Sequence, residues 1–585
     1  MSSILLAYEA GIYCVTIRYS DKNEKLKNSH SHMKIYSHLL RYLILITILP
    51  IFGFGQECMW SSKAGGWKYD GGGYVFSDKF SNTYITGVTR SDYCYFNTDT
   101  ISSGWFIVKY NAGGNESWIL NLRSGTGPKE GEDGGISMAI DTINDQLLVT
   151  GSFYNFLILP DTVIHGTKNT VFVMKLDLNG NINWYKTAGG TGDDQAFGIT
   201  FDSDRNIYIS GSNESDAIFG QDTIPKGGFL AKYDANGNVI WAYNKFRFKK
   251  LHTSGYPYTE APPIHLTFSN RSLLVYGGAQ NDTIIVDTVT FINRPGFNSA
   301  YLASFSATGD FRRINLVAGP SGLCGGLSSD NLNNLYITGT YYQKGIFGGD
   351  TLIAPGSDGD CFLAKYDSSG NLIWVASTQS SSMASGWGIG CSRDGSVYIG
   401  GNFHGTAHFG NTTLTSSTTS NDMFLAKYSP VGSNIGVRQY YYGDIFGIAF
   451  DASDNICITG DFYDTLNIGS NTFTQQGQGD LFVAKCSAIT GIEEPIRTKS
   501  SELLIYANPT SGTCNITIPE DFKNEKNLIL LIYDSNGKLI QQVPVKLNEE
   551  IISFDIKAQA NGIYSAVLTN GKKNYTGKII FSNTP

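Results

Sequence analysis

Two histidines stand four residues apart in the segment FHGTAHFG, at His404 and His408. Side chains at that spacing lie on one face of a β-strand, where two imidazoles can bind a metal ion such as zinc. A zinc site needs further protein ligands, and we find no third ligand beside this pair. The pattern is therefore more typical of two exposed histidines in a loop or at a strand edge, and we predict no metal site.

Aspartates recur at short spacing in two segments, FDSDRN at 201–206 and FDASDN at 450–455. Calcium-binding loops use carboxylates spaced in this way. The glycine at the sixth place and the distal glutamate of an EF-hand loop are missing here. We therefore favour aspartates that form turns by accepting hydrogen bonds from the neighbouring backbone.

Lysine occupies the same place in six copies of a recurring segment of the type FLAKY, at Lys109, Lys175, Lys232, Lys365, Lys427 and Lys485. A ring of six cations could bind an anionic glycan. Lysines in strands more often lay their stems along the sheet and pair with nearby aspartates, and we favour this second interpretation.

Other signatures of catalysis are absent from the sequence. It contains no HExxH segment of a metalloprotease, no GxSxG segment of a serine hydrolase and no P-loop. We therefore predict no catalytic residue and no cofactor. The net charge is −8 and no basic stripe is visible, which argues against nucleic acid as a partner.

The elements that must position these residues repeat along the chain. Seven copies of the FLAKY-type segment lie roughly 60 residues apart, each preceded by a segment of the type YISG. Several copies are followed by the turn Asp-x-x-Gly-Asn and a tryptophan. The third unit contains GITFD, IYISG, FLAKY and NVIWA, and each of these segments is typical of a β-strand.

Four strands per repeat predict an all-β protein in which residues 56–491 form a seven-bladed β-propeller with four-stranded blades. A composition of 13% aromatic and only 16% charged residues, with 67 glycines, fits strands joined by tight turns. A solenoid of stacked coils is the alternative, but its repeats would be shorter and would lack the tryptophan of the fourth strand.

The repeats resemble the SBBP family of seven-bladed β-propeller proteins, most clearly in AGGTGDDQAFGITFDSDRNIYISGS at 188–212. The fourth unit departs from the pattern, with Ser304 in place of lysine and no tryptophan in its last strand. The segment AKYDANGNVIW also resembles the tryptophan-docking motif of quinoprotein propellers. Its spacing is one residue short and the vicinal cysteine pair of quinoprotein alcohol dehydrogenases is missing, so the tryptophans more simply pack neighbouring blades.

The seventh unit lacks a fourth strand, because FVAKC at 482–486 is followed by SAITGIEEP. The segment CMWSSKAGG at 58–66 has the pattern of a fourth strand. We predict that it completes the seventh blade, with Trp60 beside the segment that begins at Phe482. This arrangement would close the ring and remove two free strand edges.

The register of this closure predicts a disulfide. In the third unit the turn 234–238 places Tyr233 opposite Val239, and the equivalent positions of the closing blade hold Cys486 and Cys58. Opposed residues of antiparallel strands can have Cβ atoms close enough for a disulfide, and an exported protein meets an oxidising environment. Two buried thiols that face each other without a bond are the alternative.

Residues 33–55 have the pattern of a signal peptide. A positively charged start precedes an apolar stretch, and small residues lead to a cleavage site between Gly55 and Gln56. A membrane anchor is the alternative, but the stretch is short and contains a proline, so we expect no stable transmembrane segment in the mature protein. Residues 1–32 are polar and unpatterned, and we expect them to be a non-native extension.

The C-terminal part changes in composition. Residues 492–502 are charged and typical of a linker, and residues 503–585 contain alternating strands broken by Asn-Gly and Ser-Gly turns, as in a small Ig-like β-sandwich. This segment resembles the type A C-terminal sorting domain of type IX secretion. The resemblance is carried by NPTSG, YDSNGK, NGIY and KII, with the sorting residues Asn508, Pro509, Gly512, Gly562, Tyr564 and Lys578. Ala507 departs from the family, which usually has proline there.

The resemblance implies that residues 503–585 bind the type IX secretion machinery after the signal peptide has directed the chain across the inner membrane. The product would be secreted or held at the outer-membrane cell surface of a Bacteroidota-type bacterium. An ordinary Ig-like binding module at the C-terminus is the alternative.

For the propeller we predict a monomeric, non-catalytic binding or adhesion module whose ligand is an unidentified glycan or protein. A rigid disc that carries variable loops suits recognition. The alternative is a propeller enzyme, a lyase, hydrolase or quinoprotein-like protein with its site at the channel mouth. A cluster of convergent ionisable residues at that mouth would favour the enzyme.

Asp-Thr followed by an aliphatic residue recurs between the second and third strands of five units, at 99, 161, 222, 287 and 350. Each occurrence first predicts a hairpin, because it falls between two strands. The tripeptide also resembles the O-glycosylation sequon of these bacteria, and both interpretations stay open.

Overall fold

The computed structural model describes residues 58–489 apart from 126–135, 250–262, 281–282, 293–297, 318–321, 357 and 417–419. It also describes residues 503–582 apart from 504, 507, 509, 520–521, 524–527, 535–537, 547–548, 558 and 571–573, and the paired strands β1 (Ile4–Tyr8) and β2 (Gly11–Val15). The predicted signal peptide, its cleavage site at Gly55 and Gln56, the linker 492–502 and Pro509 lie outside the described residues. The described chain is all-β and contains no α-helix, and hence no helix long and apolar enough to cross a membrane.

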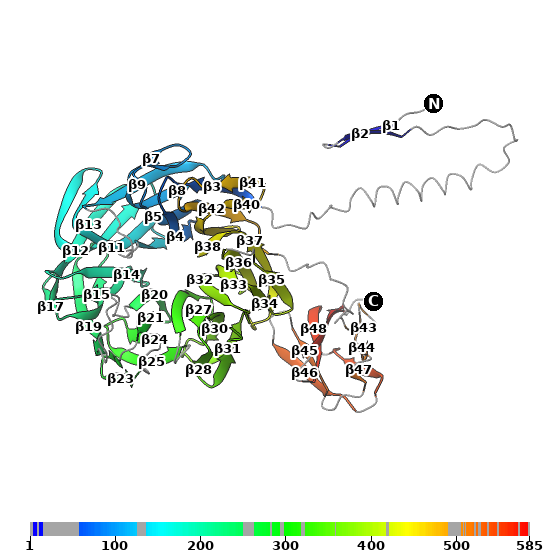
Figure 1. Ribbon diagram of the computed structural model, residues 1–585. Helices are drawn as coiled ribbons and strands as arrows, with labels where there is room; N and C mark the ends of the chain where they lie inside the picture. The colour runs from blue at the N-terminus through cyan, green and yellow to red at the C-terminus, as the bar shows by residue number, and fades with distance from the viewer. Residues whose placement is uncertain are drawn as a thin grey trace. The chain divides into compact units, whose positions relative to one another are not determined.

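The repeats fold into groups of four antiparallel strands (Figure 1). Within each group we call the strands first, second, third and fourth, in the order in which they lie side by side in the sheet. The groups that begin nearest the N-terminus are β4 (Asp70–Ser77), β5 (Thr83–Thr89), β8 (Gly104–Tyr110) and β9 (Glu116–Ser124); β10 (Ser137–Asp141), β11 (Gln146–Leu159), β12 (Thr162–Asp177) and β13 (Ile182–Gly190); and β14 (Asp194–Phe201), β15 (Ile207–Asn213), β18 (Gly227–Tyr233) and β19 (Val239–Lys249). The next are β20 (Pro263–Ser269), β21 (Ser272–Gln280), β24 (Asn298–Ser306) and β25 (Phe311–Val317); and β26 (Gly322–Ser329), β27 (Leu335–Tyr341), β30 (Asp360–Tyr366) and β31 (Leu372–Ser377). The last are β32 (Met383–Cys391), β33 (Val397–His404), β36 (Asp422–Tyr428) and β37 (Asn434–Tyr440); and β38 (Gly443–Phe450), β39 (Ile456–Phe462), β42 (Asp480–Cys486) and β3 (Cys58–Ala64).

The first strands of these groups contact one another in chain order, from β4 through β10, β14, β20, β26 and β32 to β38, and β38 contacts β4. Figure 1 shows these strands around a common centre, with the other strands of each group farther out. No single sheet closes on itself. The arrangement of this unit is therefore propeller-like, with the first strands innermost.

Additional pairings join some neighbouring groups into larger sheets of ten and six strands. Strand β9 pairs with the long strand β11 through Ser124 and Leu157. Strand β13 pairs with β16, and strand β19 pairs with β22. The sequence pattern did not predict these extra pairings.

Short hairpins connect the second and third strands of most groups, where the Asp-Thr-aliphatic segments stand. They are β6 (Cys94–Tyr95) with β7 (Thr100–Ile101), β16 (Ala217–Phe219) with β17 (Asp222–Ile224), β22 (Thr283–Val286) with β23 (Val289–Ile292), β28 (Lys344–Phe347) with β29 (Asp350–Ile353), β34 (Thr406–Phe409) with β35 (Thr412–Thr415), and β40 (Thr465–Ile468) with β41 (Asn471–Thr474). Several turn at a glycine of positive φ, such as Gly220 (φ +61°) and Gly410 (φ +59°). Each hairpin lies against the fourth strand of the preceding group; for example, His408 N donates to Thr378 O at 2.7 Å.

Neighbouring groups are held together by a tryptophan and a lysine that share one acceptor. Trp118 Nε1 and Lys109 Nζ both donate to the carbonyl oxygen of Leu178, at 3.1 and 2.8 Å. Two further pairs repeat this contact: Trp184 and Lys175 on Ala235 O, and Trp374 and Lys365 on Pro430 O. Each acceptor lies in the turn before the next group's fourth strand. The turn glycine lies against the indole, since a Cβ on Gly180 (φ +87°) would approach Trp118 to 2.9 Å.

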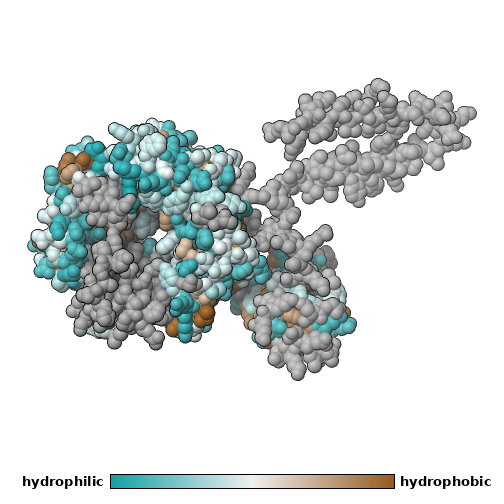
Figure 2. Space-filling view, viewed as in Figure 1, coloured by the Kyte–Doolittle hydropathy of each residue, from teal (hydrophilic) through white to brown (hydrophobic). Residues whose placement is uncertain are grey.

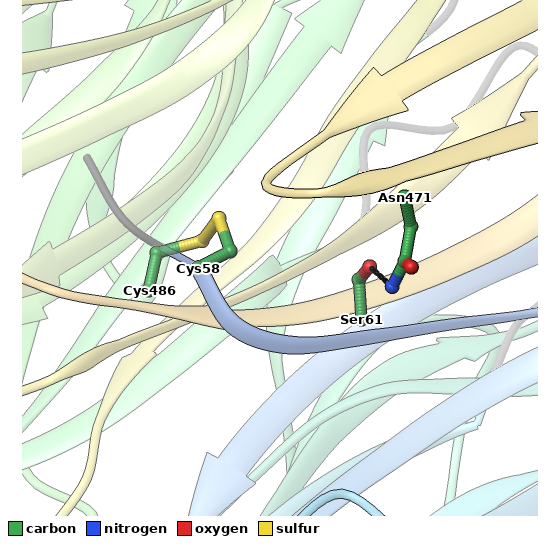
Figure 3. The surroundings of a disulfide bond; sticks show 4 residues. All are labelled: Cys58, Ser61, Asn471 and Cys486. Carbon is green, nitrogen blue, oxygen red and sulfur yellow. Dashed lines mark hydrogen bonds between the residues drawn. A yellow bond between two sulfur atoms is a disulfide. The ribbon is translucent and has the colours of Figure 1, made fainter. Parts of the chain in front are cut away.

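The last group takes its fourth strand from the N-terminal side of the unit. Strand β3 pairs with β42 in a register that sets Cys58 opposite Cys486, and the two residues form a disulfide (Figure 3). Trp60 lies opposite Lys485, while Phe482 lies opposite Lys63 on the same pair of strands.

The tryptophan contact described above recurs at this junction. Trp60 Nε1 donates to Ala112 O at 3.1 Å, and its ring stacks on Tyr110 at 5.5 Å between centroids. Asn471 Nδ2 in the neighbouring hairpin donates to Ser61 Oγ at 2.8 Å (Figure 3). The junction between the last and first groups therefore repeats the tryptophan contact, while Lys485 Nζ donates to a separate acceptor, Ser81 O, at 2.5 Å.

Residues 492–585 form a separate compact unit. One sheet contains β43 (Ile505–Tyr506), β44 (Thr513–Thr517) and β47 (Ile551–Asp555), and the other contains β46 (Leu539–Pro544), β45 (Ile529–Tyr533), β48 (Gly562–Thr569) and β49 (Asn574–Phe581). Both sheets contribute to one hydrophobic core, with Ile516 and Phe554 from the first and Leu530 and Leu568 from the second. Alternating burial along each strand places these side chains inside.

Candidate functional site

A cavity of about 470 Å³ lies among the first strands of the groups. Each of those strands contributes to its lining, which includes the side chains of Tyr74, Met138, Ile199, His265, Trp387 and Phe446. Apolar and aromatic side chains line the cavity together with a similar share of polar surface. A cavity of this size and character is typical of a ligand-binding site, which makes the centre of this unit the first candidate.

Three aromatic side chains reach this cavity from β-bulges. The register of the first and second strands shifts between Gly72 and Val75, between Gly386 and Gly388, and between Ile445 and Gly447. The additional residues at these places are Tyr74, Trp387 and Phe446, which line the cavity and are only half-buried. A bulge re-aims a side chain that a regular strand would place elsewhere. We call these three residues the aromatic collar.

His265 is the histidine of the cavity lining, and its surroundings limit its chemistry. Its ring lies between Tyr74 and Tyr276, with ring centroids 6.4 and 6.2 Å away. Burial lowers the pKa of His265 to about 4. A histidine of such low pKa is a weak base near neutral pH, so it is poorly suited to general base catalysis.

Two buried carboxylates face each other near one end of the cavity. Asp444 and Asp461 are directly opposite on β38 and β39, three residues from the cavity-lining Gly447. The hydroxyl of Tyr463 lies 3.0 Å from Asp461 Oδ2 and 3.3 Å from Asp444 Oδ2. Tyr69, which precedes β4, donates to Asp461 Oδ2 at 2.5 Å. We call Asp444 and Asp461 the carboxylate pair.

Three neighbouring groups build the surroundings of this pair. Asn402 of β33 donates through Nδ2 to Asp444 Oδ1, and Tyr69 comes from the segment that leads into β4. Gly479 allows the two tyrosines to approach, because a Cβ there would lie 3.0 Å from the ring of Tyr463 and 3.3 Å from that of Tyr69. The pair therefore depends on contacts that exist only when the last and first groups meet.

The electrostatics of the pair favour protonated groups, while burial limits access to them. Burial raises the pKa of both carboxyl groups, and the charge of Asp444 raises the pKa of Asp461 further. Asp461 is fully buried and Asp444 is 8% exposed. Burial and the neighbouring carboxylates raise the pKa of Tyr69 and Tyr463 above the ordinary range, so both phenols keep their protons.

Replacing Asp461 by asparagine should flatten the pH dependence of stability between about pH 4 and pH 7. The pKa of Asp461 is raised from 3.8 to about 7, so in this range the folded state binds more protons than the unfolded state. The wild-type free energy of unfolding should therefore fall as pH rises, by up to about 1.4 kcal/mol per pH unit for one proton. Urea unfolding at pH 4, 5, 6 and 7 measures this slope, with Asp92→Asn as an exposed control. An equally steep slope in Asp461→Asn would contradict the expectation.

Exposed aromatic side chains gather at the same end of the groups as the carboxylate pair. The exposed fractions are 83% for Trp67, 65% for Tyr93, 49% for Tyr95, 48% for Tyr441 and 37% for Tyr463. All five lie where a first strand begins or beyond the end of a second strand. We call this set the aromatic face. Figure 2, in one view of the molecule, shows apolar residues only in scattered brown groups among the described residues.

Contacts between loops bring the aromatic face together. Tyr95 pairs with Gly65 through an isolated bridge, and Gly66 packs on the backbone of Tyr93. Gly477 packs on the backbone of Trp67, and Tyr463 N donates to Tyr442 O at 2.9 Å. The loops of the last and first groups therefore carry the aromatic face.

The histidine and aspartate patterns form no site in the described residues. His404 ends β33 and His408 lies in β34, with Gly405 (φ +79°) between them, so the two histidines stand on different strands. His404 is half-buried and His408 is exposed. Asp202 accepts hydrogen bonds from the backbone of Asp204 and Asn206, which is the turn that the sequence favoured. Among the described residues no group of three His, Cys, Asp or Glu side chains could hold a metal ion.

The repeated lysines are largely buried and paired. Lys232, Lys365, Lys427 and Lys485 are 8%, 6%, 9% and 1% exposed. They form ion pairs with Asp202 (3.4 Å), Asp330 (3.8 Å), Asp394 (3.6 Å) and Asp451 (3.2 Å), respectively. These four contacts agree with pairing rather than with a ring of free cations for an anionic glycan.

The described sorting residues lie on both sheets of the C-terminal unit. Asn508 Nδ2 donates to Lys578 O at 2.6 Å, and Ile580 N donates to Asn508 Oδ1 at 2.8 Å. Tyr564 is buried and its hydroxyl donates to Ala560 O at 2.5 Å, while Gly562 begins β48. Gly512 O accepts from Ile556 N at 3.1 Å on the other sheet. Asn508 and Lys578 are therefore brought together, and Gly512 N donates to Thr510 Oγ1 at 3.1 Å in the turn that follows Asn508.

Comparison with known proteins identifies the C-terminal unit. Residues 504–582 match the family model of the secretion system C-terminal sorting domain. This match confirms the prediction of a secreted or cell-surface protein and supports an interaction of this segment with the type IX secretion machinery.

Two curated proteins are remotely similar to the chain. It is 22% identical over 507 residues to an uncharacterized WD repeat-containing protein of Acanthamoeba polyphaga mimivirus, which covers 69% of this chain and 36% of that protein. It is 23% identical over 199 residues to the regulatory protein FlaEY of Caulobacter vibrioides, which covers 32% of this chain and 20% of that protein. The chain thus spans only 36% and 20% of the length of these relatives.

Solved structures give remote matches as well. An ulvan lyase, described as a polysaccharide lyase, is 12% identical with a TM-score of 0.37, and the match covers 73% of this chain and 98% of that one. The endosialidase of phage phi92 is 11% identical with a TM-score of 0.31, and the match covers 90% of this chain and 88% of that one.

Proposed function

We propose that this exported protein is a non-catalytic glycan-binding module. In this proposal residues 56–491 form a seven-bladed β-propeller of the SBBP type, closed by the N-terminal strand. Residues 503–585 form an Ig-like β-sandwich that delivers the propeller through the type IX machinery of a Bacteroidota-type cell. The module acts as a monomer and uses no cofactor.

The observation that carries the proposal is the aromatic face beside the central cavity. Trp67 and Tyr93 are 83% and 65% exposed, which is unusual for side chains that bury large areas when they find a partner. Tryptophan and tyrosine are the residues most often responsible for binding energy at interfaces. The C–H faces of sugar rings pack on such aromatic rings, while hydroxyl groups find acceptors in the neighbouring polar side chains.

The second candidate is an enzyme that uses the carboxylate pair. Paired carboxylates carry out general acid–base cleavage of glycosidic bonds when both can reach the substrate. Here Asp461 is fully buried and two phenols hold their protons against the pair, so we favour binding over catalysis. Incubation with a bound glycan, followed by assay of new reducing ends and of unsaturated products, distinguishes the two candidates.

Replacing Trp67 by alanine should weaken glycan binding at least tenfold, the loss expected when a well-packed aromatic contact is removed. A glycan array identifies ligands of the wild-type protein, and calorimetry then compares the variants. Phe80→Ala is the matched control, because Phe80 is 61% exposed but lies in the turn Asp78–Asn82 that follows a first strand, at the opposite end of the groups. The proposal fails if no glycan binds, or if Trp67→Ala binds as tightly as the control.

A further inference from the structure

We infer that the carboxylate pair is a subsite for a positively charged amine, so the glycan bound at this end of the propeller carries free amino groups. This inference rests on the proposed function and specifies the class of ligand. It makes Asp444 and Asn402 the residues that select between a charged amino sugar and its acetylated form.

One cation lies behind a partner of the pair, since the Arg90 guanidinium is 5.2 Å from the ring centroid of Tyr69, whose hydroxyl donates to Asp461. The donors that contact the two carboxylates directly are the uncharged groups of Tyr69, Tyr463 and Asn402. Asp480, another buried carboxylate of the last group, does form an ion pair, because it accepts a hydrogen bond from Lys63 Nζ at 2.9 Å. Two carboxylates that share one hydroxyl donor, Tyr463, without a cation are unfavourable when both are ionised. A cationic ligand would remove this repulsion.

Acceptor groups at the pair also lack donors. Asp461 Oδ1 and Asn402 Oδ1 are buried and have no hydrogen-bond partner among the described residues. The side chain of Asn402 is buried, with 6% of its surface exposed. Its amide points toward Asp444, and Nδ2 donates to Asp444 Oδ1. Buried acceptors without donors are costly, and a cation held close to them would lower that cost. An ammonium group brings three N–H donors and no acceptor, which fits this surplus of acceptors.

The geometry allows a ligand to reach part of the pair. Asp444 and Asn402 keep 8% and 6% of their surfaces exposed, while Asp461 lies fully buried behind them. Direct contacts would therefore form with Asp444 and Asn402, and Asp461 would add its charge. The partly exposed ring of Tyr463 stands beside the pair, and an aromatic ring attracts a cation over its face.

A metal ion fits the surroundings less well than an amine. Calcium takes six to eight oxygen ligands, and the described residues supply only two carboxylates and one amide oxygen here. Two oxygens of the carboxylate pair are already occupied by phenol hydroxyls. Binding of a metal ion is therefore treated as a competing outcome of the experiment.

Calorimetry with two chemically matched ligands tests the inference at pH 7. The wild-type protein should bind a hexasaccharide of β-1,4-linked glucosamine at least tenfold more tightly than the fully N-acetylated hexasaccharide. Asp444→Asn should remove this preference. Asp92→Asn should retain it, because Asp92 pairs with Lys68 at 3.1 Å on the exposed surface and lies outside the pair, although it removes the same charge.

Several results would overturn the inference. They are equal binding of the two hexasaccharides, a preference that survives in Asp444→Asn, or a preference that disappears when the wild-type protein is treated with EDTA, which would assign the pair to a metal ion. The comparison of ligands on the wild-type protein needs no variant, so it stands even if Asp444→Asn fails to fold. If other glycans bind at the aromatic face but the amino sugar does not, the proposed function survives and this inference fails; if no glycan binds, both fail.

Discussion

Replacing Cys58 and Cys486 together by alanine should lower the free energy of unfolding of the compact unit that contains all the repeats by about 3–5 kcal/mol. We call this compact unit, which contains residues 58–489, the repeat unit. The disulfide joins residues 428 positions apart, and the chain-entropy relation gives about 6 kcal/mol for a loop of that length as an upper value. The bond also fixes β3 to β42, and this pairing is what supplies the last group with its fourth strand.

Urea unfolding followed by tryptophan fluorescence measures this loss, because all eight tryptophans lie between residues 60 and 387 and report on the repeat unit alone. Cys391→Ala is the control, since Cys391 is a half-buried free cysteine of the same unit. Wild-type protein treated with a reductant should unfold at the same urea concentration as the double variant. Equal stability of wild type and double variant would show that the bond contributes nothing to closure.

Deleting residues 503–585 should leave the protein in the periplasm and reduce its amount at the cell surface and in the medium by more than tenfold. The deleted segment contains the whole match to the sorting domain, so the secretion machinery would have nothing to recognise. Cell fractionation and immunoblotting with an antibody against the repeat unit measure the distribution.

The truncated protein must remain folded for this result to be meaningful. The repeat unit and the C-terminal unit are separate compact units with their own cores, so the deletion should leave the urea unfolding curve of the repeat unit unchanged. The assignment of the sorting function to this segment would be contradicted if the truncated protein unfolds normally and still reaches the cell surface in wild-type amounts.

The register of the closing strand could be predicted because repeats make distant positions equivalent. The turn 234–238 sets Tyr233 opposite Val239, and the same register appears between Cys486 and Cys58 although these two residues are 428 positions apart. Turn length and the two-residue period of a strand fix such a register locally. Comparison of the units then transfers it to the junction of the chain ends.

The carboxylate pair was missed for the opposite reason. Its partners Tyr69 and Asn402 belong to other groups, so their approach depends on packing between groups, and for Tyr69 on contact between the last and first groups, rather than on any local pattern. One signal was available, because the place of Asp461 after the second-strand glycine is held by Val88, Ser212 and Asn402 in other units. Asp461 is a charged residue at a position where these other repeats have uncharged residues, and this difference indicates that the last repeat makes a contact that they do not make.

The positions of histidines and aromatic residues in single repeats depend on where a strand ends or bulges, and the repeat pattern specifies these points only in part. The spacing of His404 and His408 would place them on one face of a continuous strand, but β33 ends at His404 and Gly405 takes a φ of +79°. The bulges at Trp387 and Phe446 did leave a signal, because an aromatic residue followed by Gly-Ile stands at both, as it does at the bulge of Phe197. The two-residue period of a strand does not by itself show that the chain bulges there.

Strand β3, which comes from the N-terminal side and completes the last group, constrains the order in which the repeats can fold. Synthesis and translocation run from the N-terminus, so β3 emerges among the first described strands and must wait until Cys486 has crossed before it can find its place. During that interval the strand is an unpaired edge in a crowded compartment, where chaperones hold such segments until their partners arrive. Pairing of β3 with β42 and formation of the disulfide are therefore late steps in the folding of the repeats.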